Sequence, residues 1–200
     1  METGTRPRRR YQMVARAEAT AAMRQRILDS ADELFRSLAS DRFSLEDVAA
    51  GAGTTVQTVL RHFGSKDLLL RAGVSRATER VRDQRMQAPV GDVPGAVKNL
   101  VEHYELHGDM VMRWLAEEDR NPFLQEIVER GRGMHREWVA HAFAPQLRRL
   151  RGAVRRRRLA QLVAVTDVYV WKLLRRDMQL GREQTQVAIV ELIERLEEPR

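Results

Sequence analysis

A cluster of amide, hydroxyl and basic side chains between residues 44 and 66 has the chemistry needed to contact DNA. Gln57 is the most informative of them, because a glutamine amide can form two hydrogen bonds with adenine in the major groove. Val56 and Thr58 beside it could contact a thymine methyl group. Hydroxyl and basic groups could hold phosphates, which position a protein on the duplex. The predicted DNA-contacting residues are Ser44, Thr54, Thr55, Val56, Gln57, Thr58, Arg61, His62 and Lys66.

Two short helices joined by a glycine turn are predicted to position these side chains. Ser44 can cap the first helix, because serine is a preferred residue at that position. Gly51 and Gly53 are expected to end this helix, and Thr54 or Thr55 to cap the second. A helix, a glycine turn and a helix are typical of a helix-turn-helix, whose second helix enters the major groove. An ordinary αα-hairpin would produce the same pattern.

The stretch AGTTVQTVLRHFGSKDLLL, residues 52–70, resembles the signature of the tetracycline-repressor (TetR) family of regulators. The matching residues are Gly53, Thr58, His62, Phe63, Ser65, Lys66, Asp67 and Leu68. The family's first helix is matched by Arg26, Ile27, Leu28, Ala31, Leu34 and Phe35. The chain departs from the family at Thr54, Thr55 and Leu60, and at position 60 a phosphate-contacting tyrosine is common. The resemblance implies a sequence-specific DNA-binding transcriptional regulator, specifically a repressor that responds to a small, largely apolar organic ligand.

Charge distribution agrees with a DNA-binding end. The chain of 200 residues has a formal net charge of +7, of which +5 lies in residues 1–86 and +2 in residues 87–200. An excess of Lys and Arg is the electrostatic footprint of nucleic-acid binding. With no cysteine, no membrane span and no secretory signal in the sequence, we expect a cytoplasmic protein.

The periodicity of apolar residues predicts an all-α fold of about nine helices in two domains. Residues 1–64 are expected to form a basic arm and the helix-turn-helix, with a bridging helix at about 65–86. The Pro- and Gly-containing stretch 87–93 then leads into a ligand-binding and dimerisation domain over 87–200. The first twelve residues are expected to be disordered, and the arginine-rich stretch 148–158 to be a solvated loop, with a second anion-binding patch as the alternative. Further predicted helices cover 13–39, 92–107, 109–118, 122–143, 159–180 and 183–196.

Aromatic and methionine residues become frequent after residue 93, which favours an apolar ligand pocket, although core packing would explain each residue equally well. We expect an apolar or cationic ligand near Tyr104, His107, Met110, Trp114, Phe123, Trp138 and Trp171. The last two long helices each carry apolar stripes that could pack in a four-helix arrangement with a second copy. The predicted homodimer interface comprises Leu162, Val163, Thr166, Val170, Ile189, Ile193 and Leu196.

The sequence contains little that resembles the motifs of known classes of enzyme. His103 and His107 are spaced to share a helix face and could clamp a metal, but the sequence HYELH lacks the glutamate directly after the first histidine that a zincin needs. The sequence contains no GxSxG, P-loop or GxGxxG motif. We therefore expect no enzyme, no cofactor and no metal. The alternatives are a metal-dependent helical enzyme using HYELH, or a nucleic-acid-binding protein without sequence specificity.

Overall fold

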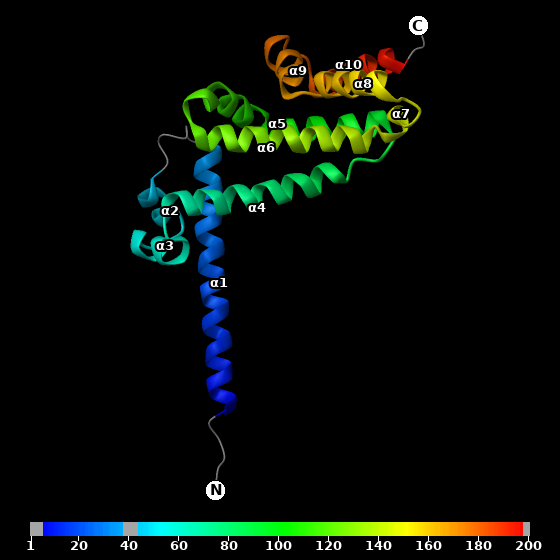
Figure 1. The fold of residues 1–200 in the computed structure, drawn as a ribbon. Coiled ribbons are helices and arrows are strands. Elements are labelled where there is room, and N and C mark those ends of the chain that lie inside the picture. The colour runs from blue at the N-terminus through cyan, green and yellow to red at the C-terminus, as the bar shows by residue number, and fades with distance from the viewer. Residues whose placement is uncertain (1–5, 38–43, 198–200) are drawn as a thin grey trace. The chain divides into compact units, whose positions relative to one another are not determined.

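The computed structural model describes residues 6–37 and 44–197, and every regular element within them is helical, which confirms the all-α prediction (Figure 1). The helices in chain order are α1 (Arg6–Ser37), α2 (Leu45–Gly51), α3 (Val56–Phe63), α4 (Lys66–Met86), α5 (Val93–Glu117), α6 (Pro122–Ala142), α7 (Ala144–Arg148), α8 (Gly152–Val165), α9 (Val168–Lys172) and α10 (Arg182–Glu197). A 3-10 turn, η2 (Glu118–Arg120), follows α5, and a π-helical turn, η3 (Leu173–Asp177), follows α9. Within the described part of the chain, no helix is long and apolar enough to cross a membrane.

The chain divides into two compact units, Met1–Ala77 and Thr78–Arg200. The division falls within α4, the helix that the sequence predicted as a bridge. The predicted domain limits at residues 64 and 87 stay predictions.

The first unit contains α1, α2, α3 and most of α4. Its core includes Ile27, Val48, Val59, Phe63 and Leu69, so each of the four helices contributes a buried side chain. The residues of α2 and α3 that face this core recur at helical spacing, as the sequence predicted.

Helix α1 begins at Arg6, whereas the sequence predicted a disordered arm up to about residue 12. Alanine and arginine are among the strongest helix formers, and they extend the helix toward the N-terminus. The first five residues and the predicted connector 41–43 lie outside the described residues.

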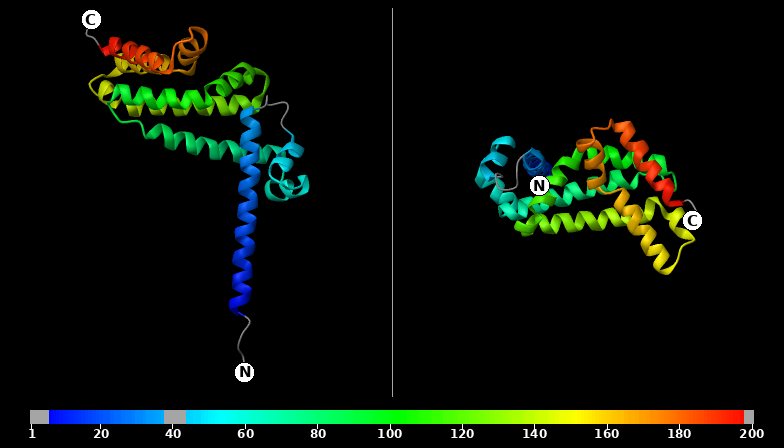
Figure 2. Two further views of the ribbon diagram at one scale, coloured as in Figure 1. Left: turned by 180° about the vertical axis from the view of Figure 1, so that it is seen from behind. Right: turned by 90° about the horizontal axis from the view of Figure 1, so that it is seen from above.

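The second unit is built on α5 and α6, which lie side by side, with α9 and α10 packed on α5 (Figures 1 and 2). As predicted, Asp92 caps α5 by accepting a hydrogen bond from Gly95 N, and Asn121 caps α6 by accepting from Phe123 N and Leu124 N. Among the described residues, Trp171 is the largest side chain that is fully buried, and it belongs to a core that α5, α6, α7, α8, α9 and α10 share.

Helix α5 continues through Gly108, where the sequence predicted that one helix would stop and another would start. The glycine is buried, and a Cβ atom at this position would overlap the six-membered ring of Trp171. Gly108 is therefore a packing position inside a helix, where the absence of a side chain admits the indole ring.

The region after α6 also differs from the prediction. Much of the supposed loop at 148–158 is helical, because α8 starts at Gly152 and includes Arg155–Arg158. The single helix predicted over 159–180 is interrupted at Thr166 and Asp167. Thr166 Oγ1 donates to Leu162 O, and Asp167 caps α9 by accepting from Tyr169 N. Side chains that bond to the backbone in this way compete with a continuous helix.

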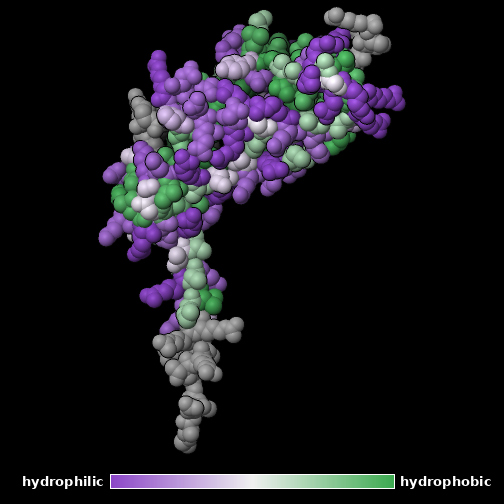
Figure 3. Space-filling model, viewed as in Figure 1, coloured by the Kyte–Doolittle hydropathy of each residue, from purple (hydrophilic) through white to green (hydrophobic). Residues whose placement is uncertain are grey.

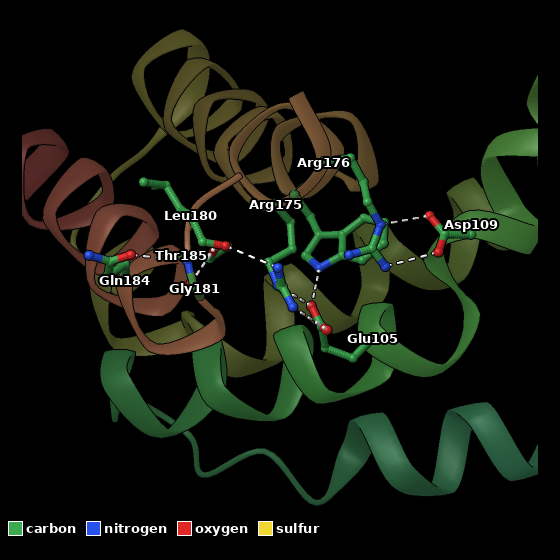
Figure 4. A network of polar contacts seen from close by, with 9 residues as sticks. Glu105, Asp109, Arg175, Arg176, Leu180, Gly181, Gln184 and Thr185 are labelled. Carbon is green, nitrogen blue, oxygen red and sulfur yellow. Dashed lines mark hydrogen bonds and ion pairs between the residues drawn. The ribbon is translucent and has the colours of Figure 1, made fainter. Parts of the chain in front are cut away.

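A polar network holds α9 and η3 against α5 (Figure 4). Glu105 accepts hydrogen bonds from Trp171 Nε1 at 3.0 Å and from Arg175 Nε and Nη2 at 2.9 and 3.1 Å. Arg176 forms a bidentate pair with Asp109, and its guanidinium lies 4.6 Å from the Trp171 ring centroid. The carboxylates of Glu105 and Asp109 thus fix the orientation of the central tryptophan.

Candidate nucleic-acid interface

Helix α2 is capped as the sequence predicted and is packed closely on α1. Ser44 Oγ accepts a hydrogen bond from Asp47 N at 3.1 Å and donates to the Asp47 carboxylate. Gly51 is the last residue of α2 rather than part of the turn, and a Cβ there would overlap the hydroxyl of Ser30. Ser30 Oγ donates to Val48 O at 3.0 Å, so Gly51 lets α1 reach the backbone of α2.

The turn and the start of α3 are set by one glycine and one threonine. Gly53 has φ of 63°, in the left-handed region that favours glycine. Of the two candidate caps, Thr55 is the one used, because its Oγ1 accepts from Thr58 N at 3.2 Å. The two threonine hydroxyls are 3.1 Å apart. Thr58 is consequently half-buried and partly engaged by the cap.

Helix α3 presents Gln57, Leu60 and Arg61 to solvent, while Val59 and Phe63 face the core. Positions 57, 60 and 61 share one face because residues three and four apart are neighbours on a helix. Leu60 is 39% exposed, so the residue that replaces the family tyrosine stands in the middle of this polar face. Val56, Thr58 and His62 are half-buried beside it.

Arg24, which the sequence patterns did not single out, joins α1 to the end of α3. Its Nη1 donates to His62 O at 3.0 Å, and its guanidinium lies 4.1 Å from the Phe63 ring centroid. The exposed Gln57 face and the Arg24 contact are on the same short helix. Apolar periodicity could not reveal this role, because Arg24 is an exposed residue of α1 that gains its partners only in the fold.

The segment after α3 begins a new helix within a few residues. Gly64 ends α3 with φ of 83°, and Ser65 caps α4 by accepting from Leu68 N at 3.2 Å. Lys66 is the first residue of α4 and is half-buried. Amides at a helix N-terminus attract anions, so the position suits contact with a phosphate. Further along α4, Arg76 forms ion pairs with Asp29 and Asp32 of α1, which sequence patterns did not reveal.

The residues predicted for a ligand pocket divide into two groups. Tyr104, Trp138 and Trp171 are buried in the core, with polar atoms already bonded: Tyr104 Oη donates to Thr166 O and Trp138 Nε1 to Arg85 O, both at 3.0 Å. Burial raises the pKa of the Tyr104 hydroxyl well above its ordinary value. His107, Met110, Trp114 and Phe123 are half-buried. Their role in binding a ligand stays a prediction.

His103 and His107 share one face of α5, with ring centroids 5.0 Å apart. The part of the chain that the structure describes contains no group of three or more His, Cys, Asp or Glu residues able to hold a metal. Burial, and then the nearby charge of Arg85, hold the pKa of His103 well below its ordinary value. The imidazole of His103 is therefore neutral at pH 7.

Four of the residues predicted for a dimer interface, Leu162, Thr166, Ile189 and Ile193, need correction. Ile193 is 0% exposed, and Leu162, Thr166 and Ile189 are also buried in the core of the second unit, so they leave no surface for a partner. Val163, Val170 and Leu196 are half-buried against the same core, and their role in a dimer stays a prediction. A stripe that serves the unit's own core has the same periodicity as one that serves a partner, which explains the error.

Comparison with known proteins agrees with this arrangement. Residues 27–73 match the model of the family described as "Bacterial regulatory proteins, tetR family". A transcriptional regulator from Rhodococcus sp. Rha1 shares the fold, with 16% identity and a TM-score of 0.65 over 86% of this chain and 94% of that one. A protein from Mesorhizobium loti MAFF303099 described as a TetR-family transcriptional regulator has 18% identity and a TM-score of 0.66, with coverage of 88% and 95%. The multidrug binding protein EbrR, complexed with imidazole, has 22% identity and a TM-score of 0.57, with coverage of 85% and 89%. No curated protein matches the sequence.

The first unit therefore carries the helix-turn-helix segment of a DNA-binding transcriptional regulator. Residues 27–73 place this segment in the tetR family of bacterial regulatory proteins, which confirms the resemblance read from the motif, and the whole chain has the all-helical fold of such regulators. Regulators of this family are generally not enzymes.

Proposed function

We propose that this protein is a ligand-responsive transcriptional repressor that binds operator DNA as a homodimer. The observation that carries the proposal is the solvent-exposed face of α3, with Gln57 and Arg61 held on a helix that is capped by Thr55 and tied to α1 by Arg24. A rigid helix with exposed amide and guanidinium groups fits the major groove.

The role proposed for each residue of the DNA-binding face follows from the solvent exposure and the chemistry of its side chain. Gln57 lies in the first turn of α3, where side chains reach base edges, and would read an adenine. Val56, Thr58 and Leu60 offer methyl groups that could meet thymine. Phosphates would be held by Ser44, Thr54, Thr55, Arg61, His62 and Lys66, which together fix the register of α3 in the groove.

A small organic ligand would bind in the second unit and shift the population between DNA-competent and DNA-incompetent states. Such a ligand acts only as far as its affinity for the two states differs. EbrR, a multidrug binding protein of the same fold, is complexed with imidazole, which supports ligand binding by this kind of helical unit.

The dimer would form through the exposed faces of α8 and α10. Hydrophobic side chains gather on the side of the second unit formed by α8, α9 and α10 (Figure 3), and the exposed apolar residues there include Val154, Val187 and Leu192. The helices also have complementary charges, because α8 carries Arg155–Arg158 and α10 exposes Glu183, Glu191 and Glu194. Opposite charges across an interface fix its register more than they add affinity.

Selection of bound duplexes from a random DNA pool tests the proposal directly. A dimeric repressor should enrich two similar half-sites related by two-fold symmetry, whose centres are about one helical turn or a multiple of it apart. The protein should then reduce transcription of a reporter gene placed behind the selected sequence. A selected pool without shared sequence would favour non-specific nucleic-acid binding. Cell fractionation would check the proposed cytoplasmic location.

A further inference from the structure

We infer that the second unit contains a binding site for the carboxylate of a small organic acid, and that Arg85 is its anchor. The inference deepens the ligand-responsive function proposed above and rests on it only for its regulatory meaning, because binding of the acid can be measured without DNA. It also replaces the expectation of an apolar or cationic ligand with a ligand of negative charge.

Arg85 lies near the end of α4 and is only 7% exposed. Its Nη2 is 3.1 Å from His135 Nδ1, and its guanidinium lies 4.1 Å from the Trp138 ring centroid. The buried Nε has no hydrogen-bond partner. Among the described residues, no carboxylate forms an ion pair with this guanidinium. Buried arginines are nearly always paired with an acid, because an isolated buried charge is strongly unfavourable.

Two other arginines that are partly buried form ion pairs with carboxylates of the chain. Arg175, which is half-buried, is paired with Glu105, and Arg76, also half-buried, is paired with Asp29 and Asp32. Arg85 is more deeply buried than either, yet its neighbours are neutral: a hydrogen bond joins it to the Tyr104 hydroxyl, and two aromatic rings and histidines surround it. Contact between a cation and an aromatic ring compensates only part of the lost hydration.

The titratable groups around Arg85 do not supply a negative charge. Burial, followed by the charge of Arg85, lowers the pKa of His135 to about 3, and the same two causes hold the pKa of His103 well below its ordinary value. Both imidazoles are neutral at pH 7, and burial lowers the pKa of Arg85 itself. Burial raises the pKa of the Tyr104 hydroxyl, so that this group is also neutral at pH 7. The carboxylate of Asp167 raises the pKa of Tyr104 further, but it accepts its hydrogen bond from Tyr169 N of α9. The site thus has one uncompensated positive charge.

These features define the ligand by its chemistry. A guanidinium binds a carboxylate through two parallel hydrogen bonds, and the pair neutralises the buried charge. The rings of Tyr104 and Trp138, 5.8 and 4.1 Å from the guanidinium, favour an aromatic or aliphatic body attached to the acid. A single arginine among neutral histidines fits a monoanion, whereas a cationic ligand would be repelled.

Arg85 lies on α4, the helix that also carries the proposed phosphate contact Lys66. Helix α4 carries Arg85 near its C-terminal end and Lys66, a proposed phosphate contact, as its first residue. An acid that pairs with Arg85 therefore binds to the helix that leads out of the helix-turn-helix. We expect the acid to lower operator affinity, provided that it prefers the DNA-incompetent state.

The test compares acids with their uncharged amides on the full chain. Benzoate and hexanoate are the probes, and benzamide and hexanamide are the controls. Thermal unfolding is followed by tryptophan fluorescence, because all three tryptophans lie in the second unit. At least one acid should raise the unfolding temperature of the wild type more than its amide does. The inference is overturned if neither acid exceeds its amide.

Two variants distinguish binding of the acids at Arg85 from a general effect of removing a positive charge. Arg85→Met should lose the response to the acids, while Arg82→Met, which removes an exposed charge on the same helix, should keep it. Without a ligand, Arg85→Met should unfold at the same or a higher temperature than the wild type, because an unpaired buried charge is gone. If Arg85→Met does not fold, Arg85→Lys, which keeps the charge but not the planar fork, should bind the acids more weakly.

An Arg85 variant that responds as the wild type does would refute the inference. Failure of the unliganded wild type to bind operator would contradict the proposed function and leave the acid site standing.

Discussion

Arg24 of α1 holds the last turn of α3. Its guanidinium covers the Phe63 ring at 4.1 Å from the centroid and donates to His62 O at 3.0 Å. A positive group at a helix C-terminus is favourable, because it meets carbonyl oxygens that have no partner within the helix. The position of α3 therefore depends on a residue outside the helix-turn-helix.

Replacing Arg24 by alanine should loosen α3. Loss of the ring contact and the hydrogen bond should destabilise the helix end by about 1–2 kcal/mol. Amide hydrogen exchange over Val56–Phe63 should become faster, and operator affinity should fall. Arg26→Ala is the matched control, because it removes an equal charge from an exposed neighbour on α1. Equal exchange rates in the two variants would contradict this role.

Gln57→Ala should affect operator DNA far more than random duplex. If the amide pairs with adenine, the loss should be about 1–3 kcal/mol at one operator position, with relaxed specificity at that base pair. Affinity for the selected operator, for single-base variants of it and for random duplex gives the answer. An equal loss on all three would mean that Gln57 is not a base reader and that α3 lies differently in the groove.

Lys66→Ala should weaken binding to every duplex alike. Contact with a phosphate contributes counterion release rather than sequence readout, so the slope of log affinity against log salt should decrease by about 1 per subunit. Lys98→Ala removes the same charge from the exposed surface of α5 and should leave the slope unchanged. A specificity change in Lys66→Ala would refute the assignment.

Sequence alone located the helix-turn-helix because the signals that specify it are local. The caps at Ser44 and Thr55 and the turn at Gly53 each act within a few residues of their own position. Propensity likewise predicts helix for α1, although the clustered arginines led to an expectation of disorder at its start.

The features that sequence did not reveal depend on residues far apart in the chain. Gly108 looks like a helix stop until Trp171 is placed against it, and Arg85 looks like an ordinary surface arginine until His135 and Trp138 enclose it. The stripe that includes Ile193 illustrates the same limit, because periodicity identifies a buried face but not the surface that buries it.

Gly108→Ala should destabilise the second unit. The added methyl group must displace the fully buried Trp171 ring, and overpacking of this kind costs about 1–3 kcal/mol. Gly131→Ala is the control, because it is also inside a helix but has open space around its missing Cβ. That variant should be unchanged or more stable by up to about 1 kcal/mol. Urea unfolding monitored by tryptophan fluorescence measures both, and a Gly108→Ala variant as stable as Gly131→Ala would disprove the packing argument.

Val187→Lys should separate the proposed dimer into monomers. Val187 is 56% exposed on α10, and in the proposed interface a lysine there would replace an apolar contact and face the arginines of α8 in the second copy, which would be unfavourable. Glu183 and Glu191 stand one turn away on either side, so the lysine should not weaken the helix itself. Leu106→Lys provides the control, because Leu106 is 76% exposed on α5 and also has a glutamate one turn before it. Sedimentation velocity should show a dimer for the wild type and Leu106→Lys and a monomer for Val187→Lys. Operator affinity should fall with the dimer, since a monomer can occupy only one half-site. A monomeric wild type, or a dimer that survives Val187→Lys, would place the assembly surface elsewhere.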